Sequence, residues 1–241
     1  MKAWTRRDLT IVPMGDSCLV IACDSCGAVG AKSGDIFKLS PRYVGKFAAR
    51  VSLTEVMCAG AKPSVITNGV ACEMEPTGQG IILGIRDELK NAGITDVVLT
   101  GSTEENFATS MTAMALTVIG AVPKSKLKFE RAAKGDNLIL FGSPKMGPEV
   151  DLESTGFYKE IERLLKLPGV KEIIPVGSKG VAYEAKTLAA LNGVECELYQ
   201  TEIDYLKSAG PATCLLVLCA QSVALEVLSF YQPATTIGEI K

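Results

Sequence analysis

The chain opens with two short apolar runs separated by turn residues. Residues 18–22 are apolar and residues 9–12 are apolar except for Thr10, and Pro13, Gly15 and Asp16 lie between the two runs. Proline, glycine and aspartate favour the backbone angles and local hydrogen bonds of a tight turn. The pattern predicts a pair of strands over residues 9–23.

Helical spacing replaces this pattern between residues 41 and 61. Apolar side chains recur there at i, i+3, i+4 and i+7, and Gly60 and Pro63 end the pattern. The positions concerned are Val44, Phe47, Ala48 and Val51. We expect a helix with small residues that allow it to pack closely on a sheet. Glu55 lies in the middle of this helix, where the sequence favours a solvated charge.

A strand and a second helix follow. Residues 64–72 predict a short strand, and residues 80–92 predict a helix with apolar residues on one face. Thr77 is the expected N-cap of that helix, because its hydroxyl can accept from a free amide of the first turn. Gly93 suits the left-handed position that follows the last helical residue.

The first half ends with two more apolar runs, at residues 97–99 and 111–122, with a polar segment between them. This arrangement predicts a strand, a turn and another strand, which Pro123 stops. Residues 124–128 are basic and lack core periodicity. They predict a boundary between domains of residues 1–123 and 124–241.

The second half alternates helices and strands, which predicts an α+β or α/β domain. A turn at residues 134–137 precedes an apolar run that ends at Gly142. The further expected elements are helices at 157–167, 179–191 and 221–230 and strands at 194–199 and 213–219.

Composition narrows the possible functions. The net charge of −2 over 241 residues gives no bulk attraction to nucleic acid or to anionic membranes. The chain contains no histidine, which excludes Ser-His-Asp and Cys-His catalysis. Its eight cysteines lie mostly in apolar runs, as buried thiols do in reducing compartments, and Cys23 and Cys26 are interpreted in the same way. No signal peptide and no membrane-spanning run is recognisable, so we expect a cytoplasmic protein.

Two glycine-rich loops carry a lysine each. Residues 24–38 contain Lys32, and residues 142–147 contain Lys145. Glycine lets the backbone approach a ligand closely, and a lysine on such a loop can reach a phosphate as a point charge. The alternative is that both lysines are solvated. A P-loop is rejected, because only two residues separate Gly27 from Gly30.

The polar segment at residues 100–106 is the main candidate for a functional site. It places two adjacent carboxylates, Glu104 and Glu105, beside hydroxyl and amide side chains. Oxygen-rich loops of this kind suit a hard cation or a phosphate-bearing ligand. An ordinary solvated turn is the alternative interpretation.

The order of these motifs resembles the aminoimidazole ribonucleotide synthetase-like (PurM-like) ATP-binding superfamily. The likeness covers the chain from about residue 8 to its end. The matching positions are Gly15-Asp16, Asp24, the central Ser52-Leu53-Thr54-Glu55 and final Gly60-Ala61-Lys62-Pro63 of the helix, Thr100-Gly101-Ser102-Thr103, and Ala133-Lys134-Gly135-Asp136 with Gly142. Within the superfamily, residues 72–78 and 100–106 look most like the α-ribazole kinases of cobalamin salvage.

The resemblance implies a two-domain α+β fold. The N-terminal mixed α/β domain would bind ATP and Mg²⁺ and contribute strands to a barrel shared by a homodimer, and a smaller α+β domain would follow. The implied reaction transfers the γ-phosphoryl group of ATP to the 5′-hydroxyl of α-ribazole. The implied metal ligands are Asp16, Asp24, Glu55, Glu104 and Glu105. The implied phosphate-binding residues are Lys32, Gly101, Ser102, Thr103 and Lys145.

Two departures from the superfamily pattern bear on the metal site. An aspartate of the helix motif is replaced by Glu55, and the aspartate of the Gly-Gly-Asp-Thr motif is replaced by Ser102. Glu104 or Glu105 is the hypothetical substitute for the second one. No catalytic residue is assigned. The alternatives are another member of the superfamily, such as thiamine-monophosphate kinase, or a non-catalytic nucleotide-binding protein.

Overall fold

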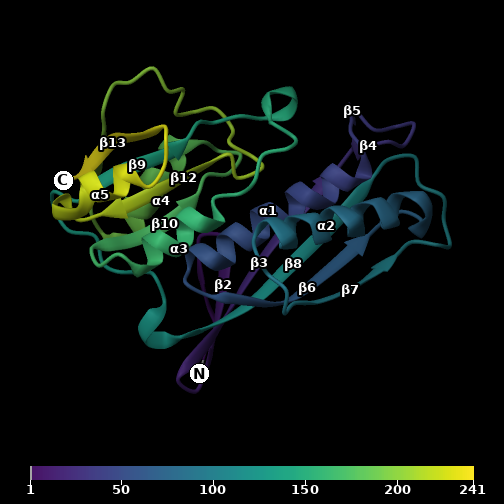
Figure 1. Cartoon of the computed structure of the whole chain (residues 1–241), viewed down its shortest axis with the longest axis horizontal. Helices are drawn as coiled ribbons and strands as arrows, with labels where there is room; N and C mark the ends of the chain where they lie inside the picture. Colours follow the sequence, from purple (N-terminus) through teal and green to yellow (C-terminus); the bar gives the residue numbers. More distant parts are fainter. Residues whose placement is uncertain (1) are drawn as a thin grey trace. The chain divides into compact units, whose positions relative to one another are not determined.

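The computed structural model describes residues 2–241, which form two compact units (Figure 1). The first unit contains the described residues up to Met57 together with Ala61–Ser125 and Leu152–Gly156. The second contains Cys58–Gly60, Lys126–Asp151 and Phe157–Lys241. Among residues 2–241, no helix combines the length and the apolar character needed to cross a membrane.

The first unit is built on a six-stranded sheet with the order β1-β2-β3-β8-β6-β7. Neighbouring strands are antiparallel except β6 and β7, which are parallel. The strands are β1 (Trp4–Arg6), β2 (Leu9–Met14), β3 (Ser17–Gly27), β6 (Lys62–Val70), β7 (Val98–Thr103) and β8 (Ala113–Pro123). A separate two-stranded sheet joins β4 (Val29–Gly30) to β5 (Phe37–Lys38).

Two helices, α1 (Pro41–Cys58) and α2 (Gln79–Asn91), lie side by side over one face of this sheet (Figure 1). The Ser52 hydroxyl of α1 donates to the carbonyl of Leu116 in β8. The two helices approach closely because Gly84 of α2 leaves no room for a side chain: a Cβ atom there would lie 1.7 Å from the carbonyl oxygen of Arg42. Gly84 therefore sets the spacing between the two helices.

The opposite face of the sheet is only partly covered. Side chains of β3 and β8 alternate between buried positions, such as Val20 and Val118, and partly exposed positions, such as Ile21 and Ile119. Cys23 on β3 is exposed, contrary to the expectation that it is a buried thiol. Alternation of this kind is typical of a sheet with one face in a core.

The second unit is an antiparallel five-stranded sheet with the order β10-β12-β9-β13-β11. The strands are β9 (Asn137–Gly142), β10 (Val170–Pro175), β11 (Cys196–Leu198), β12 (Cys214–Cys219) and β13 (Ala234–Ile240), and the helices are α3 (Tyr158–Lys166), α4 (Val181–Asn192) and α5 (Ala224–Ser229). Every residue of β12 is buried. Burial raises the pKa of Cys214 and of Cys219 on this strand to about 12, which keeps both as thiols.

The predicted elements of the second unit are confirmed within two residues for α3, α4, β11 and β12, whereas β10 was not predicted. In the first unit, the predicted turn between residues 97–99 and 111–122 is wrong. Residues 100–103 continue strand β7, which pairs with β6 and not with β8. β8 lies instead between β3 and β6, so the segment after β7 passes over the end of β6 to reach it.

Candidate functional site

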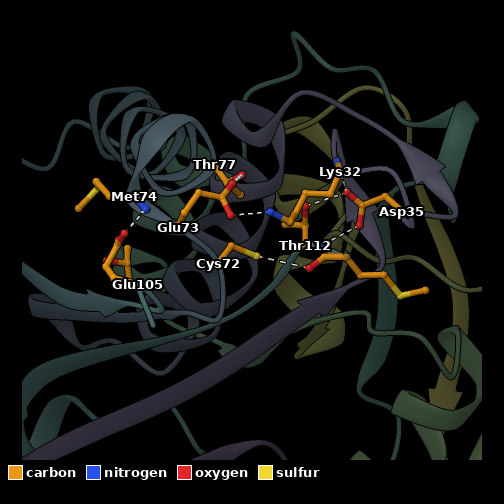
Figure 2. A network of polar contacts seen from close by, with 10 residues as sticks. Lys32, Asp35, Cys72, Glu73, Met74, Thr77, Glu105 and Thr112 are labelled. Atoms are coloured by element: carbon orange, nitrogen blue, oxygen red, sulfur yellow. Dashed lines mark hydrogen bonds and ion pairs between the residues drawn. The ribbon is translucent and has the colours of Figure 1, made fainter. Parts of the chain in front are cut away.

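Three connecting segments of the first unit meet at one end of its sheet. The pairs Gly27–Ala113, Val70–Met114 and Val70–Thr103 are in register, so the ends of β3, β6 and β7 and the start of β8 lie together. The segments that leave this edge are residues 28–40, 71–78 and 104–112, and we call this edge the loop end. Figure 2 shows the polar contacts that connect the three segments.

Asp35 holds the first segment against the start of β8. Its carboxylate accepts hydrogen bonds from the amide and the hydroxyl of Thr112, at 2.7 and 2.8 Å, and from the amide of Lys32 at 2.8 Å. Asp35 is buried. Burial alone would raise the pKa of this carboxyl, but the bonds from Thr112 and Lys32 hold the pKa below its ordinary value. The charged carboxylate thus fixes the backbone of the loop that carries Lys32.

Lys32 crosses to the second segment and pairs with Glu73 (Figure 2). Its ammonium nitrogen lies 2.5 Å from Oε2 of Glu73, and the Thr77 hydroxyl donates to Oε1, also at 2.5 Å. The hydrogen bonds from Lys32 and Thr77 lower the pKa of Glu73 to about 2. The lysine predicted to bind phosphate is therefore occupied by a carboxylate in this structure.

Thr77 does not act as the N-cap of α2. It lies within a short turn, Met74–Gly78, that directly precedes the helix, and its hydroxyl donates to Glu73 instead of accepting from a helix amide. The prediction failed because proline and glycine beside Thr77 build an extra turn before the helix begins.

The two carboxylates of the third segment have separate roles. Glu105 accepts from the amide of Met74 and from the hydroxyl of Thr103, both at 2.8 Å, and so joins the end of β7 to the second segment (Figure 2). Glu104 accepts from the amides of Asn106 and Phe107, at 2.7 and 3.2 Å, and closes a local turn. In addition, the thiol of Cys72 lies 3.4 Å from the carbonyl oxygen of Met111.

Gly101, Ser102 and Thr103 lie on β7 at the outer edge of the sheet. Gly101 packs against Asn68 of β6, where a Cβ atom would lie 2.1 Å from the Asn68 carbonyl oxygen. Glycine is required at position 101 because the backbones of β6 and β7 approach too closely there for a side chain. Ser102 is exposed. The geometry thus presents Ser102 and the end of β7 to solvent beside the loop end.

Glu55 is buried and paired, not solvated as the sequence favoured. The guanidinium of Arg7 donates to both of its carboxylate oxygens, at 3.1 and 3.3 Å. Asp24 lies on β3 near its end. Burial, assisted by the charge of Asp8, raises the pKa of Asp24 to about 6.

The remaining predicted residues lie elsewhere. Asp16 is in the turn before β3, at the opposite end of the strand from Asp24; eight residues of extended chain separate the two by roughly 26 Å. Lys145 belongs to the second unit, in the loop after β9, where its amide donates to the Thr213 hydroxyl at 3.0 Å.

The predicted metal ligands do not form one cluster. Across residues 2–241, no three cysteine, aspartate or glutamate side chains are grouped closely enough to hold a metal ion. Arg7 already balances the charge of Glu55, and backbone amides occupy one oxygen of Glu104. As placed here, these carboxylates are spread over several elements and are not gathered into one metal-binding cluster.

Several residues of the loop end were not singled out from the sequence as site residues. They are Asp35, Glu73, Thr77 and Thr112, with Arg7 at the Glu55 pair. Asp35 follows Gly34 in a glycine-rich loop and Glu73 precedes a Pro-Thr-Gly turn, so local composition marked both segments. Their partners are distant in sequence, and no local pattern points to them.

Comparison with known protein families gives a match within the N-terminal half of the chain. Residues 7–122 match the family described as AIR synthase related protein, N-terminal domain. No curated protein sequence matches the chain. The sequence resemblance to PurM-like proteins is thereby supported for the N-terminal part of the chain.

Solved structures with a similar fold cover nearly the whole chain. The hydrogenase maturation protein HypE of E. coli has a TM-score of 0.71 at 20% identity, with 92% of this chain and 79% of HypE covered. A HypE–HypF complex gives a TM-score of 0.73 at 18% identity, with 96% and 86% covered. PurL of T. maritima, complexed with AMPPCP, gives 0.70 at 15% identity, with 95% of this chain but only 41% of PurL covered. Because the sequence identities are 15–20%, these structures show a shared fold and no more than that.

Proposed function

We propose that the chain is an ATP-dependent kinase that transfers the γ-phosphoryl group of ATP to the 5′-hydroxyl of α-ribazole. The proposal that the chain uses ATP is supported mainly by the match of residues 7–122 to the AIR synthase related domain. It is supported by the shared fold with a PurL structure that was determined with AMPPCP, an ATP analogue. The acceptor is proposed from the resemblance of residues 72–78 and 100–106 to α-ribazole kinases.

The chemistry of the loop end suits phosphoryl transfer. This reaction depends mainly on positioning and on neutralising charge, so the lack of histidine is no obstacle. Lys32 supplies a positive charge held on a rigid loop by Asp35. Gly101, Ser102 and Thr103 supply backbone amides and hydroxyls at the neighbouring strand end. We propose that these groups bind and orient the phosphates of ATP.

Mg²⁺ enters this proposal as part of the substrate, bound to ATP, since the carboxylates of residues 2–241 are not grouped into one metal-binding cluster. The assignment of Asp16, Asp24, Glu55, Glu104 and Glu105 as metal ligands stays a prediction. So does the assignment of Lys145 to phosphate binding. Glu104→Gln and Glu105→Gln should weaken Mg²⁺-dependent turnover if these two carboxylates contact the metal.

We also propose a homodimer that uses the partly covered face of the first unit's sheet. Leu19, Ile21 and Ile119 are only partly buried on that face and present apolar surface there. Burying such a face against a second copy would be favourable. Sedimentation of the purified protein tests this: a monomer at micromolar concentration would contradict it.

Two alternatives remain distinct from this proposal. Another phosphotransferase of the superfamily, such as thiamine-monophosphate kinase, would use the same nucleotide site with another acceptor. A non-catalytic nucleotide-binding protein would bind ATP without turnover, and Ser102 in place of an aspartate favours this second candidate. An assay of ADP formation with α-ribazole, thiamine phosphate and no acceptor separates the three.

A further inference from the structure

The carboxylate of Glu73 lies where the loop end offers its strongest anion-binding groups. Oε2 contacts the Lys32 ammonium and Oε1 accepts from the Thr77 hydroxyl, both at 2.5 Å. The Lys32 side chain is 16% exposed, and Thr77 is buried. An ammonium group and a hydroxyl that converge on two oxygens of one anion are the contacts that a phosphate group also accepts.

The two partners of this ion pair are held very differently. Lys32 lies on a loop whose backbone is fixed by Asp35, which in turn is bound to Thr112. The Glu73 side chain is 31% exposed and reaches Lys32 from the start of a turn. A short rotation of the Glu73 side chain would release the ammonium and the hydroxyl without moving the backbone of either segment.

We propose that Lys32 and Thr77 form a phosphate subsite that Glu73 fills in the ligand-free protein, and that a polyphosphate chain displaces the Glu73 carboxylate when it binds. Glu73 is therefore an internal competitor that sets the affinity for the phosphate tail of the nucleotide. This inference deepens the proposed function, because it names Lys32 as the phosphate contact and adds Glu73 and Thr77.

The position of Glu73 supports this role. It directly precedes the turn that leads into α2, a helix of 13 residues, and the N-terminal end of a helix favours negative charge. A carboxylate supplies that charge when no ligand is bound, and a phosphate supplies it in the complex. Replacing Glu73 with an uncharged side chain of the same shape should therefore leave the subsite ready for an added anion.

The test is calorimetric titration of the whole chain with inorganic tripolyphosphate and, separately, with AMPPCP and Mg²⁺. Glu73→Gln keeps the side-chain shape but removes the competing charge, and it should tighten tripolyphosphate binding by about tenfold or more. Lys32→Met should weaken binding, and in the double variant the gain from Glu73→Gln should disappear. A purely structural role for Glu73 would not make its effect depend on Lys32.

Glu149→Gln is the matched control, because Glu149 also pairs with a lysine, Lys207 at 2.8 Å, but in the second unit. It should leave tripolyphosphate binding unchanged. Unchanged or weaker binding by a folded Glu73→Gln protein would overturn the inference. If that variant does not fold, Glu73→Asp replaces it: the shorter side chain should lose Lys32 and tighten binding, and no tightening would equally overturn the inference.

The outcomes separate this inference from the proposed function. If AMPPCP binds equally to the original protein and to Glu73→Gln, the competition by Glu73 is wrong and nucleotide binding stands. The opposite outcome is that AMPPCP binds neither the original protein nor Glu73→Gln, while Glu73→Gln binds tripolyphosphate more tightly than the original protein does. In that case the subsite stands and the kinase proposal fails.

Discussion

The guanidinium of Arg7 and the carboxylate of Glu55 form a two-point ion pair, with N–O distances of 3.1 and 3.3 Å and side-chain exposures of 5% and 9%. The pair connects the turn between β1 and β2 to the last turn of α1. Burying either charge without the other costs much more than the pair contributes.

Arg7→Met should therefore lower the free energy of unfolding by about 3–5 kcal/mol, because it removes the guanidinium that balances the charge of the buried Glu55 carboxylate. Glu55→Met should have a similar effect. The double substitution should cost clearly less than the sum of the two, which urea unfolding of all four proteins measures. Additive losses would show that the pair is not coupled.

The raised pKa of Asp24 predicts that the free energy of unfolding depends on pH. Its folded pKa of about 6 lies above the ordinary value of 3.8, so the folded protein holds the proton more tightly than the unfolded chain does. This contribution is fully present below about pH 4 and is lost as the pH rises through 6, a difference of roughly 3 kcal/mol. Asp24→Asn should then raise the free energy of unfolding by about 1–3 kcal/mol at pH 7.5 and change it little at pH 4.

The control for this experiment is Asp96→Asn, since the Asp96 side chain is 81% exposed. It should show no comparable gain at either pH. Equal effects of Asp24→Asn at pH 4 and pH 7.5 would contradict the attribution to a buried charge.

Gly101 and Gly69 offer a matched test of packing at the edge of the sheet. A Cβ atom at Gly101 would lie 2.1 Å from the carbonyl oxygen of Asn68, whereas one at Gly69 would meet nothing within 4 Å. Gly101→Ala should force β6 and β7 apart and destabilise the protein by about 1–3 kcal/mol. Gly69→Ala should be close to neutral in thermal unfolding. Similar melting temperatures for both variants would argue against the close contact.

Asp35 should control the mobility of residues 28–40. Asp35→Ala removes an acceptor for three hydrogen bonds, from the Lys32 amide and from the amide and hydroxyl of Thr112. Each unsatisfied donor costs about 1–3 kcal/mol, so amide exchange in this segment should become at least tenfold faster. Asp35→Asn, which keeps one acceptor oxygen, should give an intermediate rate. Unchanged exchange in both variants would contradict the anchoring role.

Local periodicity predicted most of the elements, because helices and half-buried strands follow fixed repeats of apolar residues. α1 and α2 came from such repeats, and β8 came from the apolar run at residues 111–122. β7 was misassigned because only two of its residues, Val98 and Leu99, lie in an apolar run, so the polar residues 100–103 looked like a turn. Its parallel pairing with β6 depends on contacts across the sheet, which no local pattern contains.

The site was less predictable than the fold. Lys32, Glu104 and Glu105 were selected because glycine-rich and acidic loops are recognisable in sequence. The residues that they contact across the fold were not found, since Glu73 is 41 positions from Lys32. The contact between Asp35 and Thr112, which are 77 positions apart, was missed for the same reason. Glu55 was interpreted as solvated for the same reason, because Arg7 lies 48 positions away. Ion pairs between segments that are distant in sequence can be identified only when the fold is known.

The proposed reaction transfers a phosphoryl group from ATP to a hydroxyl acceptor. It is tested most directly by incubating the purified chain with ATP, Mg²⁺ and α-ribazole and measuring ADP and α-ribazole 5′-phosphate together. Both products are expected in equal amounts, with a marked loss of both in Lys32→Met. No phosphorylated product from α-ribazole or thiamine phosphate, despite tight binding of ATP, would contradict it.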